Sequence, residues 1–456
     1  MMRLLIRLLP PIVALMVWST PSCAEVFSLA EALANAYETN PRLDAARAGL
    51  RSVDEGVAQA NAGWRPTINA STTYGVEHGT VQGIAKAFNS RPLTSEVSVT
   101  EPIFRGGRTY AEVSRAIAQV QAGRAELLKE EQSVLLDTVT AYMNVVRDTN
   151  SLKLNEDNLR SLQAELDAVR TQHAAGAVTR TDVDQSQARL ARAQANVAAA
   201  EQQLAASRAA FEAVIGRPAE TLEDMPALPS LPGTKDMALT LAMKQNPDVL
   251  QARANVSASE YAVDDAIGAL LPQISVSGQY QYVQDAAGTN IYGTKLPQQI
   301  LSVIGQITVP IYQGGAEEAN VRRAKELRDQ SQHSAFVAER SVRQDVEGAW
   351  QAVRSAQEAV AANQAQAKAD ESAVQGVTQE QQGGERSVLD ILNAQQELLS
   401  AQIAVESSRR DTVVAAYQLL SATGQLTAKS LGLTVKFYDP LEHYEDDAAA
   451  WVGFGD

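Results

Sequence analysis

The stretch TEPIFRGGRTYAEV at residues 100–113 returns near the other end of the chain as TVPIYQGGAEEANV at residues 308–321. Both read Thr-x-Pro-Ile-aromatic-x-Gly-Gly and then continue into a long helical pattern. Proline has no N–H and ends a strand ladder, whereas two glycines permit a sharp change of direction. We therefore expect two strand-to-helix corners, formed by Pro102, Gly106, Gly107, Pro310, Gly314 and Gly315.

The corner belongs to a duplication that covers most of the chain. Gly176 and Asp182 recur as Gly384 and Asp390 at an offset of 208 residues. A series of prolines from Pro218 to Pro232 then indicates a linker between the halves. We expect two structural repeats at residues 25–216 and 237–424, a linker at 217–236, and a C-terminal segment at 425–456 that ends in a flexible acidic tail.

Each repeat has the pattern of a short helix, two strands and two very long helices. Val183, Leu190 and Val197 recur every seven residues, with small residues three positions further on. This spacing is typical of helices that pack closely side by side. We expect strands at about 66–78, 92–104, 272–284 and 298–310, and long helices at about 108–173, 181–215, 316–380 and 387–422.

The expected strands alternate between apolar and polar residues. Residues 66–78 place Ile68 and Tyr74 on one face and Asn69 and Ser71 on the other. This pattern suits a membrane barrel, but a half-buried sheet in a soluble domain has it too. Four strands do not close a barrel, and an open strand edge does not face lipid. A membrane role therefore predicts a homotrimer, in which three chains supply 12 strands above a bundle of long helices.

The N-terminus reads as a targeting segment. Two arginines precede an apolar run from Leu8 to Trp18, and small residues precede Glu25. This pattern predicts a signal peptide at residues 1–24. Cys23 is the only cysteine, and lipid attachment at Cys23 is the alternative. No later run of about 20 apolar residues follows, so a membrane role requires strands.

Charge and composition argue against several classes of function. The formal net charge is −15, which argues against a nucleic-acid partner. The four histidines are scattered without ligand spacing, and no glycine-rich phosphate loop occurs. We therefore expect no enzyme, no metal and no cofactor, and partner proteins must supply the energy for any transport.

The duplicated halves, together with EPIFRGGR, VPIYQGGA, LPQISVSGQY, AGAVTRTDVDQSQARL and GGERSVLDILNAQQELL, resemble the TolC family of outer-membrane efflux and type I secretion proteins, nearest its alphaproteobacterial, BepC-like branch. The resemblance implies an α+β membrane protein. Its trimer would form a 12-stranded β-barrel in the outer membrane, with four strands per protomer, continued by a long α-helical tunnel in the periplasm. It also implies a passive, gated exit duct that works with a periplasmic adaptor and an inner-membrane RND or ABC transporter.

The resemblance further implies roles for residues at the helix tips. Asp390 matches an acidic ring at the closed periplasmic mouth, but Asn393 occupies a second ring position that is usually acidic. A supporting tyrosine of the family aligns near Gln381. The residues that match the gate are Thr181, Asp182, Arg386, Asp390 and Asn393, and those that match the adaptor-contact tips are Gly176, Val178, Gly383 and Gly384.

The residues themselves leave other interpretations open. Thr181 and Ser387 also suit the N-cap region of a helix, Asp182 and Asp390 suit a first helical turn, and Arg386 suits a solvated surface. A secreted trimeric coiled-coil fibre would explain the heptads and the signal peptide. It would not explain the duplicated strand pairs or the matched corners.

Overall fold

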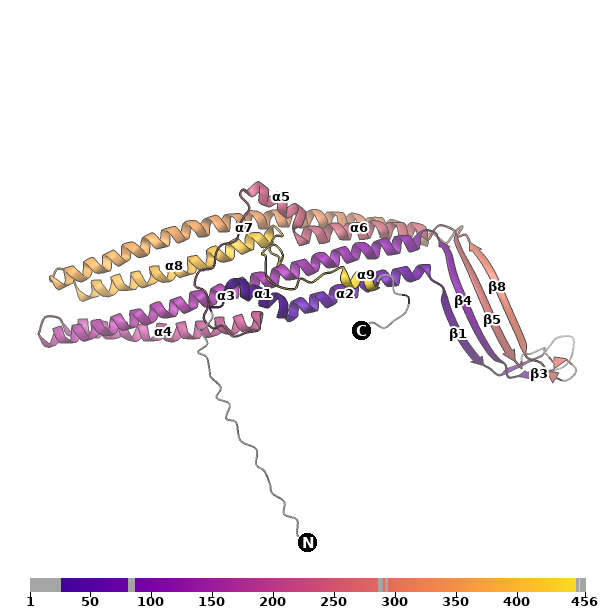
Figure 1. The fold of residues 1–456 in the computed structure, drawn as a ribbon, viewed down its shortest axis with the longest axis horizontal. Helices are drawn as coiled ribbons and strands as arrows, with labels where there is room; N and C mark the ends of the chain where they lie inside the picture. The colour runs from indigo at the N-terminus through magenta and orange to yellow at the C-terminus, as the bar shows by residue number, and fades with distance from the viewer. Residues whose placement is uncertain (1–25, 81–86, 286–289, 292–293, 448–450, 452–456) are drawn as a thin grey trace, which may run out of the picture.

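The structure is a computed structural model that describes residues 26–80, 87–285, 290–291, 294–447 and 451. The signal peptide and Cys23 lie outside these residues. The described chain is elongated, and two long helical hairpins lie side by side (Figure 1). The tips of the hairpins form one end of the helical body, and a sheet extends from the other end.

The helical body consists mainly of four long helices. The α3 and α7 helices have 67 residues each, which corresponds to roughly 100 Å at 1.5 Å per residue. Among the helices of the described residues, none is both long and apolar enough to span a membrane. The helices are α1 (Leu29–Thr39), α2 (Pro41–Asn61), η1 (Ala62–Trp64), α3 (Arg108–Ala174), α4 (Arg180–Ile215), α5 (Lys235–Gln245), α6 (Pro247–Gly268), α7 (Ala316–Gln382), α8 (Val388–Ala422) and α9 (Glu442–Asp447).

An asparagine before a proline organises the same place in both halves. Asn40 caps α2 by accepting from the Arg42 N–H, and its side-chain amide donates to the Val214 carbonyl at 2.8 Å. Asn246 caps α6 in the same way and donates to the Ala422 carbonyl at 2.9 Å. Each asparagine therefore satisfies orphan groups at the start of one helix and at the end of another.

Four strands form one antiparallel sheet in the order β1-β4-β5-β8. These strands are β1 (Thr67–Tyr74), β4 (Leu93–Arg105), β5 (Gln273–Gln284) and β8 (Gln298–Thr308), and two short hairpins pair β2 (Glu77–Thr80) with β3 (Ala87–Ser90) and β6 (Asn290–Ile291) with β7 (Thr294–Lys295). The strand expected at 66–78 is interrupted, because the Gly75 N–H binds the Pro92 carbonyl and the chain then enters the β2–β3 hairpin.

The main core lies where the long helices meet the N-terminal segment and the linker. Tyr142 on α3 is fully buried beside Phe211 on α4. The Tyr142 hydroxyl donates to the Phe27 carbonyl at 2.8 Å and accepts from the Glu223 N–H at 2.8 Å. One side chain thus ties the start of the described chain and the linker to α3.

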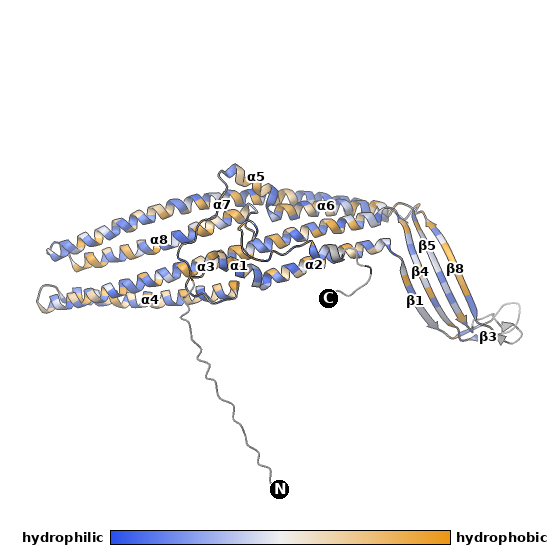
Figure 2. Cartoon of the chain, in the orientation of Figure 1, coloured by the Kyte–Doolittle hydropathy of each residue, from blue (hydrophilic) through white to orange (hydrophobic). Residues whose placement is uncertain are grey.

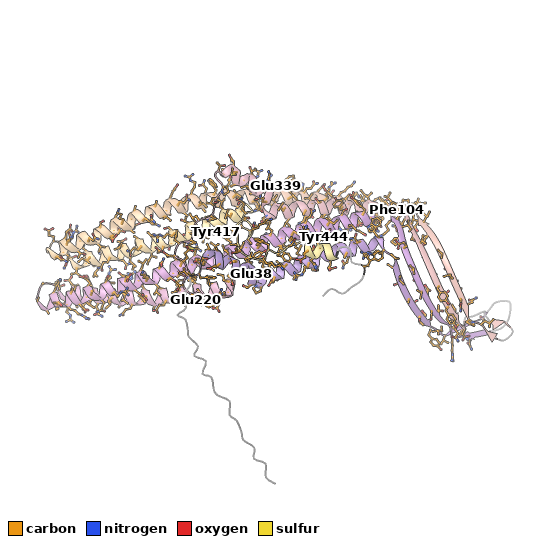
Figure 3. The ribbon with its side chains drawn as sticks, viewed as in Figure 1. Glu38, Phe104, Glu220, Glu339, Tyr417 and Tyr444 are labelled. Carbon is orange, nitrogen blue, oxygen red and sulfur yellow. The ribbon has the colours of Figure 1, made fainter. Side chains whose placement is uncertain are left out.

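The C-terminal segment contacts the helical body as far as Tyr444, and the expected acidic tail, which begins at Asp439, includes the α9 helix. The Ala428 N–H donates to the Glu131 carboxylate at 2.7 Å, and the Tyr438 N–H donates to the Tyr37 hydroxyl at 3.1 Å. The α9 helix packs on α2, and Tyr444 lies beside this contact in Figure 3. The Arg124 guanidinium lies 5.2 Å from the Tyr444 ring centre. Cation–π and backbone contacts therefore hold an acidic segment that has few apolar residues.

Candidate functional site

The strand register places apolar side chains of all four strands in shared rows on one face of the sheet, although Val283, Ile300 and Ile304 lie on the other face. Ile68 pairs with Val99, which pairs with Gly278, which in turn pairs with Val303. The row two residues along contains Ala70, Val97, Tyr280 and Leu301. The rows between them are polar and contain Asn69, Ser98, Gln279 and Ser302. Alternation that is weak in single strands thus becomes a continuous apolar face.

This apolar face has no covering element within the described chain. Leu301 is 78 % exposed, Val303 74 % and Ile68 69 %. Hydrophobic residues recur along β8 on the outer edge of the sheet (Figure 2). The edge strands β1 and β8 each pair with one neighbour, so each leaves a row of backbone N–H and C=O groups without a partner among the described residues. An exposed apolar face with two open edges indicates contact with lipid and with further strands.

The first glycine pair forms the corner between β4 and α3, beside Phe104 in Figure 3. Gly106 has φ +67° and Gly107 has φ +81°, values that disfavour other residues. A Cβ on Gly106 would lie 2.2 Å from the Gly268 carbonyl oxygen, so α6 approaches this corner closely. The Arg108 guanidinium donates to the Asp265 carboxylate at 2.9 Å and joins the same two elements.

The second glycine pair has the same backbone conformation as the first, but no neighbouring element of the described chain packs against it. Gly314 has φ +68° and Gly315 has φ +81°, and no atom lies within 4 Å of a Cβ built on either. Ile311 and Tyr312, which precede them, are 94 % and 81 % exposed. The second corner thus lacks the neighbour that α6 provides at the first.

The opposite end of the molecule carries the two helix tips. Gly176 (φ +76°) and Gly384 (φ +79°) adopt the left-handed conformation that ends α3 and α7. The Ala177 N–H reaches back to the Gln172 carbonyl at 2.9 Å, and the Glu385 N–H reaches the Glu380 carbonyl at 2.9 Å. Gly383 is right-handed and forms the C-cap of α7, so only one glycine of the Gly-Gly pair makes the turn.

Each tip then begins its next helix with the same reciprocal cap. Thr179 caps α4 and Ser387 caps α8. The Thr179 N–H donates to Asp182 Oδ2 at 2.8 Å, and the Ser387 N–H donates to Asp390 Oδ2 at 2.9 Å. These hydrogen bonds from Ser387, with the nearby Arg386 charge, lower the pKa of the Asp390 carboxyl below its ordinary value.

The structure locates the N-cap region residues and the partner of Arg386. Thr181 lies inside the first turn of α4, and the N-cap is Thr179 because its hydroxyl accepts from the Asp182 N–H. Arg386 Nε donates to Glu380 Oε2 at 3.0 Å, within its own hairpin. In the described part of this chain, no hydrogen bond or ion pair joins Arg386 to Asp182.

A small apolar cluster joins the two hairpins near their tips. Leu162 of α3 and Leu190 of α4 pack in one buried cluster with Val388 and Leu392 of α8, and Val178 packs against it. Next to this cluster, Arg189 Nη2 donates to Asn393 Oδ1 at 2.8 Å. Sequence reasoning had singled out Asn393 but missed Arg189, because the two residues are 204 positions apart and lie in different halves.

Comparisons with known proteins agree with this architecture. The family profile described as "Outer membrane efflux protein" matches residues 32–217 and 238–425. The chain is 34 % identical over 426 residues to the outer membrane efflux protein BepC of Brucella suis, covering 93 % of this chain and 91 % of the relative. It is 22 % identical to the outer membrane protein TolC of Escherichia coli, covering 93 % and 88 %. The solved outer membrane channel CmeC of Campylobacter jejuni superposes with a TM-score of 0.76 at 16 % identity, covering 92 % of this chain and 89 % of that one.

Proposed function

Because the chain belongs to the outer membrane efflux protein family, we propose that three copies of it assemble into one gated exit duct. The family that the sequence motifs indicated is thereby confirmed, and the chain is an outer-membrane channel for efflux or type I secretion with its long helices in the periplasm. The assembly, the gate and the partner contacts described next are the proposal.

The observation that carries the proposal is the one-sided sheet. Its apolar face suits the lipid of the outer membrane, and its polar face suits a water-filled interior. Its two open edges cannot face lipid, so β1 of one copy pairs with β8 of the next. Three copies give a closed barrel of 12 strands. A secreted coiled-coil fibre does not require such a barrel, so the sheet favours the membrane duct.

The two halves of the chain support the same ring. Within one chain, α6 packs against both α3 and α7, whereas α2 packs on α3. The flank of α7 away from α6 exposes Phe336 and Val337. In the trimer this flank covers α2 of the next copy, just as α3 covers α6 within one chain. Head-to-tail contacts of this kind close into a ring when the rotation matches.

The second corner fits this arrangement. Gly268 stands at the end of α6 against Gly106, whereas the matching residue at the end of α2 is Ala62, whose Cβ requires a wider contact with Gly314 than the one that Gly268 makes with Gly106. We assign Gly314 and the exposed Tyr312 to the contact with this part of the neighbouring copy. The open space around Gly314 is then filled by the next protomer.

The helix tips form the periplasmic gate in this proposal. Three Asp390 carboxylates around a narrow three-fold mouth attract cations and repel anions. Thr181 and Asp182 receive Arg386 from a neighbouring copy, and Asn393 makes the second ring neutral. Arg386 must then exchange its Glu380 partner for a neighbouring chain when the mouth closes.

The turns at the tips are the proposed contact with a periplasmic adaptor. Gly176, Val178, Gly383 and Gly384 lie at the end of the molecule furthest from the sheet (Figure 1). An adaptor bound there connects the duct to an inner-membrane RND or ABC transporter. That transporter supplies the energy, and the duct itself remains passive.

Two measurements test the proposal. Light scattering of the detergent-purified protein, corrected for bound detergent, should give the mass of three chains. Planar-bilayer recordings should give a small cation-selective conductance that multivalent cations block. Asp390→Ala should abolish the block and reduce cation selectivity, and Arg386→Ala should raise the conductance. A monomeric protein, or selectivity that is indifferent to Asp390, would overturn the corresponding part of the proposal.

A further inference from the structure

Two polar residues far apart in the chain join the helical hairpins near their tips. Arg189 lies in the third turn of α4 and Asn393 in the second turn of α8, and they share a hydrogen bond of 2.8 Å. We propose that Arg189 is a clasp that holds the two hairpins of one protomer together at the gate, and that its charge lowers the cation selectivity of the mouth. This inference rests on the proposed gate.

The clasp stands apart from the other polar links between the hairpins. Asn150 donates to Glu406 at 2.8 Å, and Arg410 donates to Asn144 at 2.9 Å. Both links reach α8 about 20 Å or more beyond Asn393, at 1.5 Å per residue. A hollow of 340 Å³, lined by polar and apolar residues, lies between α3, α4 and α8 in the intervening stretch. The upper links therefore do not hold the tips, where the hairpins are joined by the apolar cluster and by the clasp.

The apolar cluster beside the clasp allows the Arg189–Asn393 bond to be removed without disturbing the core of the hairpins. Leu392, next to Asn393, is 2 % exposed, and Leu190, next to Arg189, is 5 % exposed. Both belong to the cluster that joins the hairpins, whereas Arg189 is half-buried and Asn393 is exposed. Loss of the clasp therefore leaves the packed leucines in place, and the variants should fold.

The position of Arg189 also places a positive charge beside the acidic ring. Asp390 and Asn393 are three residues apart on α8 and so lie on the same side of the helix. The guanidinium bound to Asn393 is thus about one helical turn from the Asp390 carboxylate. A carboxylate at position 393 would neutralise this charge, but the asparagine amide does not. Arg189 therefore weakens the negative potential at the mouth.

Arg192 provides a matched control. It lies one turn further along α4 and lines the same crevice between α4 and α8 as Arg189. It carries the same charge but forms no hydrogen bond or ion pair with any residue that the structure describes. Arg192→Ala therefore removes a charge near the hairpin contact without removing a clasp.

The test is single-channel recording of the trimer with ion selectivity from reversal potentials. Arg189→Ala and Asn393→Ala should each favour the open state by roughly fivefold per protomer, the effect of losing an exposed charge-assisted bond of about 1 kcal/mol. Arg189→Ala should also increase cation selectivity, whereas Asn393→Ala should leave it unchanged. The double variant should conduct no more than either single variant, since the two residues share one interaction.

Three results would overturn the clasp: equal conductance in Arg189→Ala and Arg192→Ala, additive effects in the double variant, or wild-type conductance in Asn393→Ala. Unchanged selectivity in Arg189→Ala would overturn the charge effect. Asp390→Ala, recorded beside these variants, separates this inference from the gate itself. If Asp390→Ala alters selectivity but Arg189→Ala alters nothing, the gate stands and the clasp is wrong. If neither Asp390→Ala nor Arg189→Ala has an effect, both the gate assignment and the clasp are wrong.

Discussion

Replacing Gly106 with alanine tests whether the first strand-to-helix corner depends on close backbone contact. The new Cβ would lie 2.2 Å from the Gly268 carbonyl oxygen and 2.9 Å from Leu271 Cβ, and φ would remain at +67°. Gly107 has φ +81°, but a Cβ there meets no atom within 4 Å. Gly107→Ala is therefore a matched control that carries the left-handed backbone strain without the collision.

The two variants should differ by the cost of the collision. A left-handed backbone costs roughly 1–2 kcal/mol for a residue with a Cβ. Relieving the contact with Gly268 requires a backbone shift of about 1 Å, and overpacking of this kind typically costs about 1–3 kcal/mol. We expect Gly107→Ala to lower the free energy of unfolding by about 1–2 kcal/mol and Gly106→Ala by about 2–5 kcal/mol.

Denaturant titration of the detergent-purified protein should measure this difference. Trp64 ends η1, which lies beside the start of α3, so its fluorescence reports on the corner once Trp350 and Trp451 are replaced by phenylalanine, and far-UV circular dichroism reports on the long helices. Gly268→Ala tests the collision without left-handed backbone strain, because Gly268 is helical and its Cβ would lie 2.7 Å from the Gly106 carbonyl oxygen. Equal losses in Gly106→Ala and Gly107→Ala, with no loss in Gly268→Ala, would refute the reasoning.

Three further predictions follow from the same structure. Gly314→Ala should weaken the trimer more than Gly315→Ala, measured as the trimer fraction by light scattering; equal fractions would contradict the proposed contact with α2 of the next copy. Tyr142→Phe should lower the free energy of unfolding by about 1 kcal/mol in a denaturant titration, because it removes the hydroxyl that donates to the Phe27 carbonyl and accepts from the Glu223 N–H, while the Glu223 N–H keeps its bond to the Phe27 carbonyl. Burial raises the pKa of the Glu131 carboxyl above its ordinary value of 4.5, so the folded state binds more protons and stability falls as pH rises from 4.5 through the folded pKa. Glu131→Gln keeps an acceptor for the Ala428 N–H, so the melting temperature of the variant minus that of the wild type should increase from pH 4 to pH 8. A difference that does not change with pH would argue against titration of Glu131.

Local patterns in the sequence were enough for the elements and their junctions. Left-handed glycines, prolines without an N–H and reciprocal caps act within a few residues, so Gly106, Gly384 and Ser387 could be read directly. The length of α3 and α7 followed from an uninterrupted helical pattern without proline. The family also followed from the sequence, because its motifs lie in these same junctions.

The tertiary structure decided which distant residues meet. The apolar face exists only because the register places Val99 of β4 beside Gly278 of β5, and strand alternation alone does not select a partner. Arg386 bonds to Glu380 within its own hairpin, whereas Arg189 of one hairpin bonds to Asn393 of the other. The acidic C-terminal segment became ordered through backbone hydrogen bonds and arginine–aromatic contacts. Backbone conformation is set by neighbours along the chain, whereas these pairings depend on which surfaces the folded helices and strands bring together.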